Sequence, residues 1–282
     1  MLLKRKTSAE TLKLQEKYGV PYLVFPSLEN TGLVRHAFST RLGGCSTGDL
    51  ATMNLSSTRG DDPENVKENF QRFGAAVGFD PKDLVLSLQT HTTNVRLVTE
   101  EDRGKGFTRP RDYKDVDGLI TNVPGLVLAT FYADCVPLYF VDPVHRAIGL
   151  SHSGWRGTVN RMGEVTLQRM KEAFGTRPSD VWTAIGPSIC QDCYEVSEDV
   201  AQEFISAFEG WADNRLLYRK ENGKYQLNLW RANELVLLES GVPKDRIAVT
   251  DICTCCNPQV LFSHRASKGK RGNLGAFLQL LS

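Results

Sequence analysis

The sequence predicts a single domain of the α/β class. Short apolar segments of strand length occur along the chain, and segments with apolar residues at helical spacing lie among them. The strands are spaced too irregularly for a plain succession of βαβ units. No internal repeat, low-complexity linker or change of composition divides the 282 residues. We therefore expect a polar lead-in over residues 1–20, helical or frayed, followed by one domain over residues 21–282.

The overall composition is ordinary for a globular protein with a real core. Hydrophobic residues make up 41% of the chain, charged residues make up 24%, and the formal net charge is +1. A charge so close to zero gives no reason to expect nucleic acid or a membrane surface as a partner. No apolar run approaches the roughly 20 residues of a membrane-spanning helix. We expect a monomer.

The cysteine content points to a reducing compartment. An odd number of cysteines, without a secretion signal before them, favours reduced thiols in the cytoplasm. Some of these thiols are then free for a metal or for catalysis. The seven cysteines are Cys45, Cys135, Cys190, Cys193, Cys253, Cys255 and Cys256.

The first part of the chain predicts two strands and one well-defined helix. The strands span Tyr22–Phe25 and Leu33–Phe38. Asp62 is placed to cap the helix, with Pro63 in its first turn and Gly78 beyond its end. The apolar stripe of this helix predicts packing rather than chemistry and consists of Val66, Phe70, Phe73 and Val77.

Between the second strand and this helix lies a loop, Ser39–Gly48, that is rich in glycine and hydroxyl groups around Arg41. Backbone N–H groups and one guanidinium suit a phosphate or a carboxylate. An ordinary surface turn is an equally good interpretation of the same residues.

A histidine follows the next predicted strand. Leu84–Leu88 forms this strand and delivers His91 at its end, and Asn94–Val98 forms another. Residues 101–116 are polar and predict a long exposed loop. Because a histidine at a strand end is more often a satisfied residue than a ligand, His91 alone indicates little.

Three further strands surround a cysteine and a second histidine. Leu126–Phe131 and Leu138–Val141 flank Cys135, and Ala147–Ser151 leads to His152. These segments form a hairpin-like unit, so we expect Cys135 and His152 on neighbouring strands.

The segment after His152 predicts one helix that ends at Gly175. Arg156 lies beside its N-terminus, where unpaired backbone N–H groups and the helix dipole favour an anion. Its apolar stripe is Val159, Met162, Val165, Met170 and Phe174. Beyond it, the sequence predicts strands at Val181–Ile185 and Ile247–Val249, and helices from Ser197 and over Asn228–Ser240.

Two interpretations compete for the same three residues. His91, Cys135 and His152 offer two imidazoles and a thiolate, which suit zinc and leave a fourth position open for water or substrate. The alternative is a Cys–His hydrolase without metal, in which Cys135 is the nucleophile and a histidine is the base.

A different metal site is suggested by Cys190-x-x-Cys193 and Cys253-x-x-Cys256. The 59 residues between these pairs greatly exceed the usual interval of about 15–20 residues. Cys255 also interrupts the second pair. Buried thiols without a metal are therefore the favoured interpretation.

A series of short motifs runs in order from about residue 20 to the end of the chain. The two most specific are Ala133-Asp-Cys-Val-Pro137 and His152-Ser-Gly-Trp-Arg-Gly157. The others are Phe38-Ser-Thr-Arg-Leu-Gly-Gly44, Asn54-Leu55, Gly60-Asp-Asp62, Gln89-Thr-His91, Gly186-Pro-Ser-Ile189, Tyr194-Glu-Val196, Cys253-Thr254 and Phe262-Ser263. In this series the chain closely resembles the YfiH/YlmD laccase-domain family, bacterial "polyphenol oxidase" proteins now associated with purine nucleoside phosphorylase activity.

The resemblance implies a mixed α/β domain with β-sheets sandwiched between helices, and a zinc ion held by His91, Cys135 and His152. It implies purine nucleosides and phosphate as small-molecule partners. The implied reactions are phosphorolysis of adenosine, inosine, guanosine and methylthioadenosine, and deamination of adenosine. Family members also bring three alternatives: copper in place of zinc, polyphenol oxidation, and hydrolytic editing of peptidoglycan precursors.

Further roles are assigned within this scheme. Cys135 and His91 are catalytic as well as metal-binding, and Asp134 is a general acid–base candidate for which a structural role is equally expected. The substrate-binding candidates are Arg41, Asn54 and Arg156, of which the two arginines would hold phosphate.

The tail departs from the family pattern. The family usually has an arginine pair after Phe-Ser-Tyr and a Gly-Arg near its end. This chain instead has Phe262-Ser-His-Arg-Ala266 and, later, Gly272-Asn273.

Overall fold

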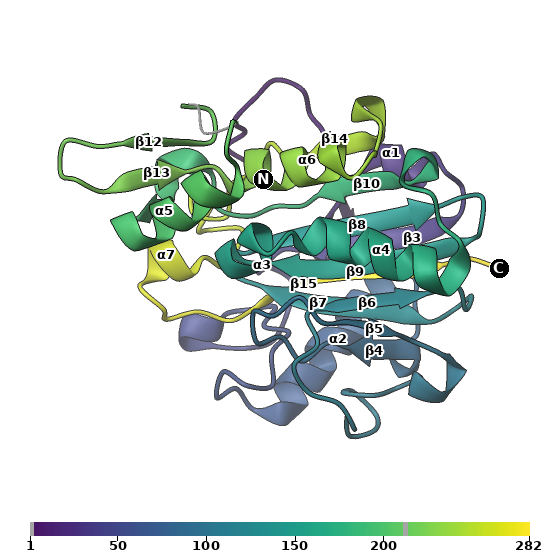
Figure 1. Ribbon diagram of the computed structural model, residues 1–282. Helices are drawn as coiled ribbons and strands as arrows, with labels where there is room; N and C mark the ends of the chain where they lie inside the picture. Colours follow the sequence, from purple (N-terminus) through teal and green to yellow (C-terminus); the bar gives the residue numbers. More distant parts are fainter. Residues whose placement is uncertain (1–2, 211–213) are drawn as a thin grey trace.

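Two six-stranded sheets packed face to face form the centre of the computed structural model, which describes residues 3–210 and 214–282 (Figure 1). In spatial order the first sheet contains β1 (Lys13–Lys17), β2 (Val20–Val24), β3 (Val34–Ser39), β15 (Leu274–Leu280), β7 (Val127–Tyr132) and β4 (Leu84–Leu86). The second sheet contains β14 (Ile247–Val249), β10 (Trp182–Ile185), β8 (Val136–Asp142), β9 (Ala147–Ser153), β6 (Gly118–Thr121) and β5 (Val95–Leu97).

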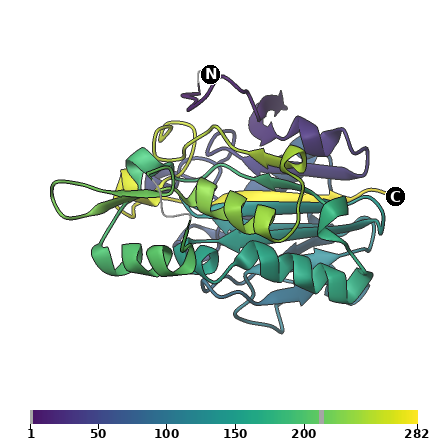
Figure 2. The same ribbon diagram turned by 45° about the horizontal axis from the view of Figure 1, so that its top comes forward.

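A third, small sheet projects from this body (Figures 1 and 2). It contains β11 (Glu195–Val196), β13 (Tyr225–Leu227) and β12 (Leu217–Arg219). The helices are α1 (Pro26–Glu29), α2 (Pro63–Val77), α3 (Trp155–Val159), α4 (Met162–Phe174), α5 (Glu198–Ala207), α6 (Leu229–Glu239) and α7 (His264–Ser267). Short 3-10 turns span Gly48–Leu50, Pro81–Asp83, Glu100–Asp102, Pro178–Asp180, Gln191–Cys193 and Lys244–Arg246.

Three layers of apolar side chains hold the elements together. One lies between the two sheets, where Leu128, Leu150 and Leu278 are fully buried. A second layer joins the second sheet to α4, α5 and α6, and a third joins the first sheet to α2. The predicted class, a mixed α/β domain with sheets sandwiched between helices, is confirmed.

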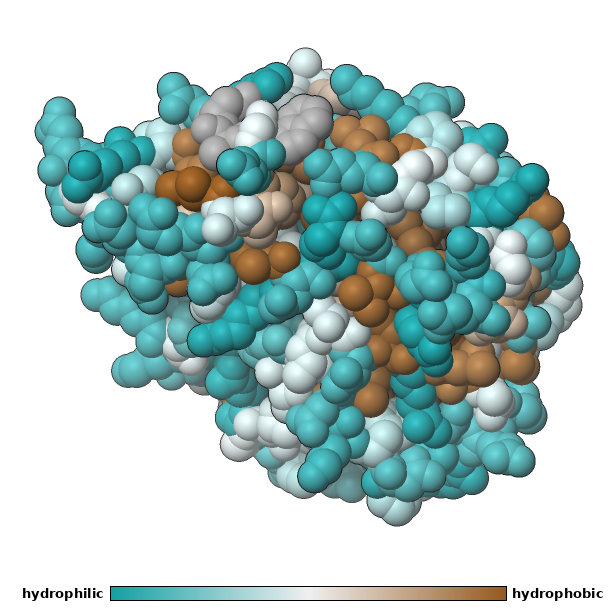
Figure 3. Space-filling model, in the orientation of Figure 1, coloured by the Kyte–Doolittle hydropathy of each residue, from teal (hydrophilic) through white to brown (hydrophobic). Residues whose placement is uncertain are grey.

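The surface on the side of the outer helices is mostly hydrophilic, as expected where these helices bury their apolar faces against the sheets. Figure 3 shows a mostly hydrophilic surface on the side where α4 and α6 lie, with scattered hydrophobic patches. No helix in the described ranges combines the length and the apolar character that crossing a membrane requires.

The helix α2 forms where its capping residues predict it. The Asp62 side chain accepts a hydrogen bond from Glu64 N at 2.9 Å, and Gly78 ends the helix with a φ of 98°. Phe70 and Phe73 bury its apolar face against the first sheet. Its caps and its apolar stripe therefore predict this element correctly.

The expectation of a helical or frayed lead-in over residues 1–20 is wrong, because Lys13–Lys17 is the edge strand β1. Tyr18 and Gly19 both have positive φ, at 53° and 74°. This is the geometry of a two-residue hairpin turn, and it pairs β1 antiparallel to β2.

The single helix expected after His152 is in fact two helices, α3 and α4. The break falls at Asn160 and Arg161, the latter with a φ of 57°. The Asn160 side chain donates to the Arg156 carbonyl at 2.9 Å, so it ends the first helix by competing for backbone groups.

Candidate active site

Strand pairing brings His91, Cys135 and His152 to one point. The parallel strands β4 and β7 lead to His91 and Cys135 at the same edge of the first sheet. The hairpin of β8 and β9 pairs Pro137 with His152, so the predicted neighbourhood of Cys135 and His152 is confirmed. The Sγ atom and one ring nitrogen from each histidine all lie within 4.8 Å of one another.

A buried carboxylate, Asp117, fixes the two histidines. Its Oδ1 lies 2.8 Å from His152 Nδ1. Its two oxygens accept the backbone N–H groups of Thr90, His91 and Thr92 at 3.0–3.1 Å. A carboxylate on the second ring nitrogen is the usual way in which a protein orients a metal-binding histidine.

Asp117 is a site residue that the sequence prediction missed. It precedes the buried strand β6, where it looks like any polar residue at a strand end. The only local signal is an acidic side chain at the start of a strand that is wholly buried.

The electrostatics of the three residues favour a thiolate. Burial by itself would raise the pKa of the Cys135 thiol, but the charge of His152 and hydrogen bonds from both histidines lower it to about 6. Burial works to lower the pKa of His152, yet the charge of Cys135 and the hydrogen bond to Asp117 raise it to about 9. A thiolate is the form in which cysteine binds a metal or attacks a substrate.

The residues present fit one metal ion. One thiolate and two imidazoles are common ligands of zinc and also of copper. Gly154 keeps the space beside them clear, because a Cβ atom there would lie 3.2 Å from Cys135 Sγ and 3.0 Å from His91 Cδ2. Three protein ligands also leave the open position that a catalytic site needs.

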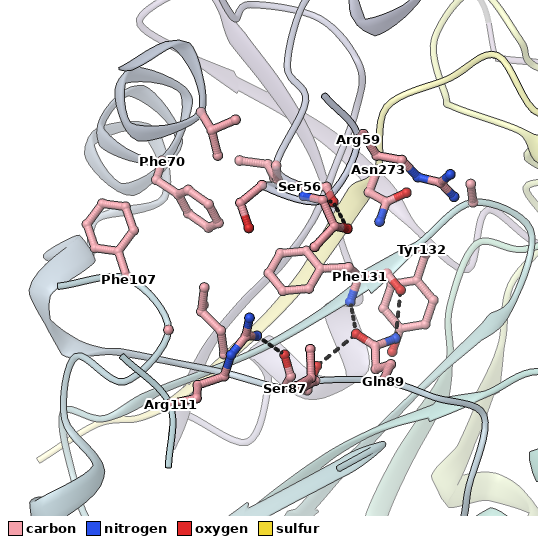
Figure 4. A pocket seen from close by; sticks show the side chains of 18 of the residues that line it. Ser56, Arg59, Phe70, Ser87, Gln89, Phe107, Arg111, Phe131, Tyr132 and Asn273 are labelled. Carbon is pink, nitrogen blue, oxygen red and sulfur yellow. Dashed lines mark hydrogen bonds between the residues drawn. The ribbon is translucent and has the colours of Figure 1, made fainter. Parts of the chain in front are cut away.

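A cavity of about 710 Å³ includes these three residues in its lining. Figure 4 shows the part of this cavity around Phe70, Phe107 and Phe131. One wall is aromatic, with the Phe70 and Phe107 ring centroids 5.1 Å apart and Phe131 at 6.2 Å from Phe70. The size and the mixture of apolar wall and polar groups are typical of a site for a small molecule.

Arginines supply positive charge to the cavity lining, namely Arg59, Arg111 and Arg271. Arg111 donates to the Ser87 carbonyl at 2.6 Å. Among the described residues, Arg271 Nε is buried without a hydrogen-bond partner. Burial and then the charge of Arg59 lower the Arg271 pKa to about 10, so these two guanidinium groups lie within electrostatic reach of each other. An anion would offset the repulsion between them.

The structure does not bring the three predicted substrate-binding residues into the lining of this cavity, as far as the described residues show. Arg41 donates to the carbonyls of Ala51 and Pro258 at 2.8–2.9 Å. Asn54 binds Asp61, Ser56 and the Asn273 backbone N–H. Arg156 is exposed, with its guanidinium 4.4 Å from the Trp155 ring centroid.

Asp134, next to Cys135, has both carboxylate oxygens engaged. Oδ1 accepts from Thr254 Oγ1 at 2.6 Å, and Oδ2 accepts from Arg265 N at 2.7 Å. Its φ of 89° is unusual for a residue other than glycine. These contacts tie the turn that carries Cys135 to the C-terminal part of the chain.

Four other cysteines also meet, although their spacing in the sequence argued against a shared site. Cys190, Cys193, Cys253 and Cys256 place their sulfur atoms within 4.8 Å of one another. The interval in sequence misleads because β10 and β14 are parallel neighbours, so the segments that follow them leave the sheet at the same edge.

Comparison with known proteins decides the family. The family model described as multi-copper polyphenol oxidoreductase laccase matches residues 35–281. The chain belongs to this laccase-domain family. The predicted resemblance is thereby confirmed.

Relatives and a solved structure agree with this membership. The chain is 35% identical over 254 residues to purine nucleoside phosphorylase YlmD of Bacillus subtilis strain 168, covering 89% of this chain and 90% of the relative. It is 33% identical over 231 residues to adenosine deaminase RL5 of an unknown prokaryote, covering 81% and 87%. The crystal structure of YfiH from Bacillus licheniformis matches with a TM-score of 0.88 and 30% identity over 95% of this chain and 99% of that chain.

In this laccase-domain protein, the two histidines and one cysteine at the site suit a single metal ion and are too few for a cluster of copper ions. The chain has five histidines. His36 is buried in β3, His145 binds Asp142 and His264 begins α7, which leaves two at the site. A multi-copper centre requires many more imidazoles around one point.

Proposed function

We propose that this protein is a zinc-dependent purine nucleoside phosphorylase that also deaminates adenosine. The names of its relatives support the reaction class. The observation that carries the proposal is a cavity in which a three-ligand metal site, an aromatic wall and paired arginines line the same space. The proposed nucleosides are adenosine, inosine, guanosine and methylthioadenosine.

His91, Cys135 and His152 would hold the zinc ion. When bound there, zinc supplies a Lewis acid that can polarise a departing purine or activate water for deamination. Asp117 keeps the His152 ring in the tautomer whose second nitrogen faces the metal position.

Phosphorolysis needs an anion site close to the ribose. The bond between C1′ and the purine nitrogen breaks, a phosphate oxygen bonds to C1′, and the base leaves with the bonding electrons. Arg59 and Arg271 are better placed to hold this phosphate than Arg41 or Arg156, because they line the cavity.

The purine itself would lie against the aromatic wall formed by Phe70, Phe107 and Phe131. Aromatic rings at the centroid separations seen here offer faces and edges on which a flat base can stack. In this arrangement Asp134 is a positioning residue, because its oxygens hold Thr254 and Arg265 rather than the cavity.

The test is to incubate purified, metal-analysed protein with adenosine or inosine, with and without phosphate, and to identify the products by mass. We expect free base and ribose 1-phosphate only when phosphate is present. Inosine formed from adenosine without phosphate would report the deaminase reaction. No turnover by protein that carries zinc at this site would refute the proposal.

Cys135→Ala provides the matched negative control. It should lose the zinc of this site and both activities together. Cys45→Ser removes a thiol that instead contacts Asn65 and Asn69, so it should retain both. Full activity in a metal-free Cys135→Ala protein would exclude the scheme.

One alternative is supported by the geometry itself. Cys135, His152 and Asp117 form a cysteine–histidine–aspartate series with a low thiol pKa, as in hydrolases that form an acyl-enzyme. Such a hydrolase, editing peptidoglycan precursors, would work after removal of zinc and would form a covalent adduct at Cys135. The copper-dependent polyphenol oxidase named by the family model would instead require copper and oxygen.

A further inference from the structure

The four cysteines outside the cavity form a compact group. Cys190 precedes a 3-10 turn after β10 and Cys193 is its last residue, whereas Cys253 and Cys256 follow β14. Cys193 Sγ and Cys190 Sγ lie 3.5 and 3.9 Å from Cys256 Sγ. All four sulfur atoms lie within 4.8 Å of one another.

We propose that these four cysteines bind a second, structural zinc ion. A tetrahedral zinc with Zn–S bonds of about 2.3 Å separates its sulfur ligands by about 3.8 Å. The separations of Cys256 Sγ from Cys190 Sγ and Cys193 Sγ, 3.9 and 3.5 Å, are close to that spacing. The sulfurs of a disulfide would lie about 2.0 Å apart. Four thiolates also complete the coordination sphere, which is the mark of a structural rather than a catalytic site.

The backbone around the group is arranged to support thiolates. The N–H groups of Cys190 and Cys256 both donate to Cys253 Sγ, at 3.2 and 3.4 Å. Four thiolates around one divalent ion carry a net charge of −2. Lys6 Nζ pairs with the Asp192 carboxylate, in the turn between Cys190 and Cys193, at 2.8 Å, so its charge is shared with that carboxylate.

The position of the group gives the ion a structural task. A parallel bridge joins Ser188 to Cys253, and Thr254 N donates to the Ser188 carbonyl at 3.1 Å. The same two loops hold Asp134, through Ile189 N and Thr254 Oγ1. The second zinc would thus lock the loops that support the turn carrying Cys135.

The first test is the zinc content of the full-length protein purified without chelator. We expect two zinc ions per chain in the wild type, one in Cys135→Ala and one in Cys253→Ser/Cys256→Ser. Cys255→Ser is the matched control from the same loop and should keep both. Because the count is read without any assay of turnover, it stands even where the proposed nucleoside reaction fails.

X-ray absorption at the zinc edge tests the same point on the wild type, even where the cysteine variants do not fold. One site with a single sulfur and one with four average to about 2.5 sulfur ligands per zinc. One zinc per chain with about one sulfur ligand would overturn the proposal. So would iron in place of zinc, or a thiol titration of the unfolded chain that finds these four cysteines oxidised.

Discussion

At the scale of single residues, Asp117 is the group on which the candidate metal site depends most. It contacts His152 through a side-chain nitrogen and His91 through the backbone. One carboxylate therefore sets the positions of two of the three candidate ligands, although it belongs neither to the loop that carries His91 nor to β9, which carries His152.

The Asp117→Asn variant should bind zinc at the three-ligand site about 10–100-fold more weakly, because the amide lacks the charge that supports the imidazole. Competition with a coloured chelator measures this affinity. Asp112→Asn is the control, since Asp112 is an exposed acid paired with Lys105. Equal affinity in the two variants would show that Asp117 has no role in binding.

The phosphate site gives a second prediction at this scale. Arg59→Ala should raise the KM for phosphate about tenfold, the loss expected for one charge-assisted contact, and leave the KM for nucleoside nearly unchanged. Arg156→Ala, which removes an exposed guanidinium outside the cavity lining, should change neither value. A raised KM for phosphate in Arg156→Ala but not in Arg59→Ala would instead indicate that phosphate binds at the N-terminus of α3.

At the scale of elements, β3 carries a buried histidine with consequences for stability. His36 Nε2 accepts the Phe25 N–H at 2.8 Å, so its ring must be neutral there. Burial lowers its pKa from 6.5 to about 3. The His36 imidazole therefore stays neutral in the folded protein at pH values at which the same side chain in the unfolded chain binds a proton.

The sign of this effect follows directly. The contribution of His36 to the free energy of unfolding is complete above pH 6.5. It is lost as the pH falls from 6.5 towards 3, at about 1.4 kcal/mol per pH unit. Between pH 7 and pH 5 the wild type should lose about 2 kcal/mol more unfolding free energy than His36→Gln. Urea unfolding at both pH values measures this, and equal losses would contradict it.

Elements were predictable where local signals suffice. The caps at Asp62 and Gly78 define α2, and the apolar runs define β7, β8 and β9. By contrast, β15 is not among the predicted strands, although its sequence is as apolar as theirs and it is buried throughout. The charged sequence of β1 does not predict a strand, and the segment is a strand because it pairs with β2 in a hairpin.

At the scale of the whole molecule, both metal candidates are assembled by strands that are distant in sequence. The meeting of the three candidate ligands of the first site was predictable, since the family motifs single them out. Asp117 and the cavity arginines were not, because only the packing of two sheets brings them to the same place. The four-cysteine group was considered from the sequence and disfavoured, because the spacing of its two pairs does not reveal that the sheet brings them together.

The second zinc predicts a local change in hydrogen exchange. In Cys193→Ser/Cys256→Ser, the amides of Lys6 and Thr254 should exchange faster, since they bond to Asp251 and Ser188 in the loops that the ion would hold. Amides in the centre of β9 should be unchanged, as should all amides in Cys255→Ser. A uniform acceleration throughout the chain would instead report general destabilisation.

The place of β15 also has a consequence for how the protein is made. This strand lies between β3 and β7, and it is the last described strand to leave the ribosome. Until it is synthesised, the nascent chain has two half-sheets whose facing edges offer unpaired backbone groups. Such edges attract strands of other chains, so the period before β15 arrives is when nascent chains most need protection by chaperones.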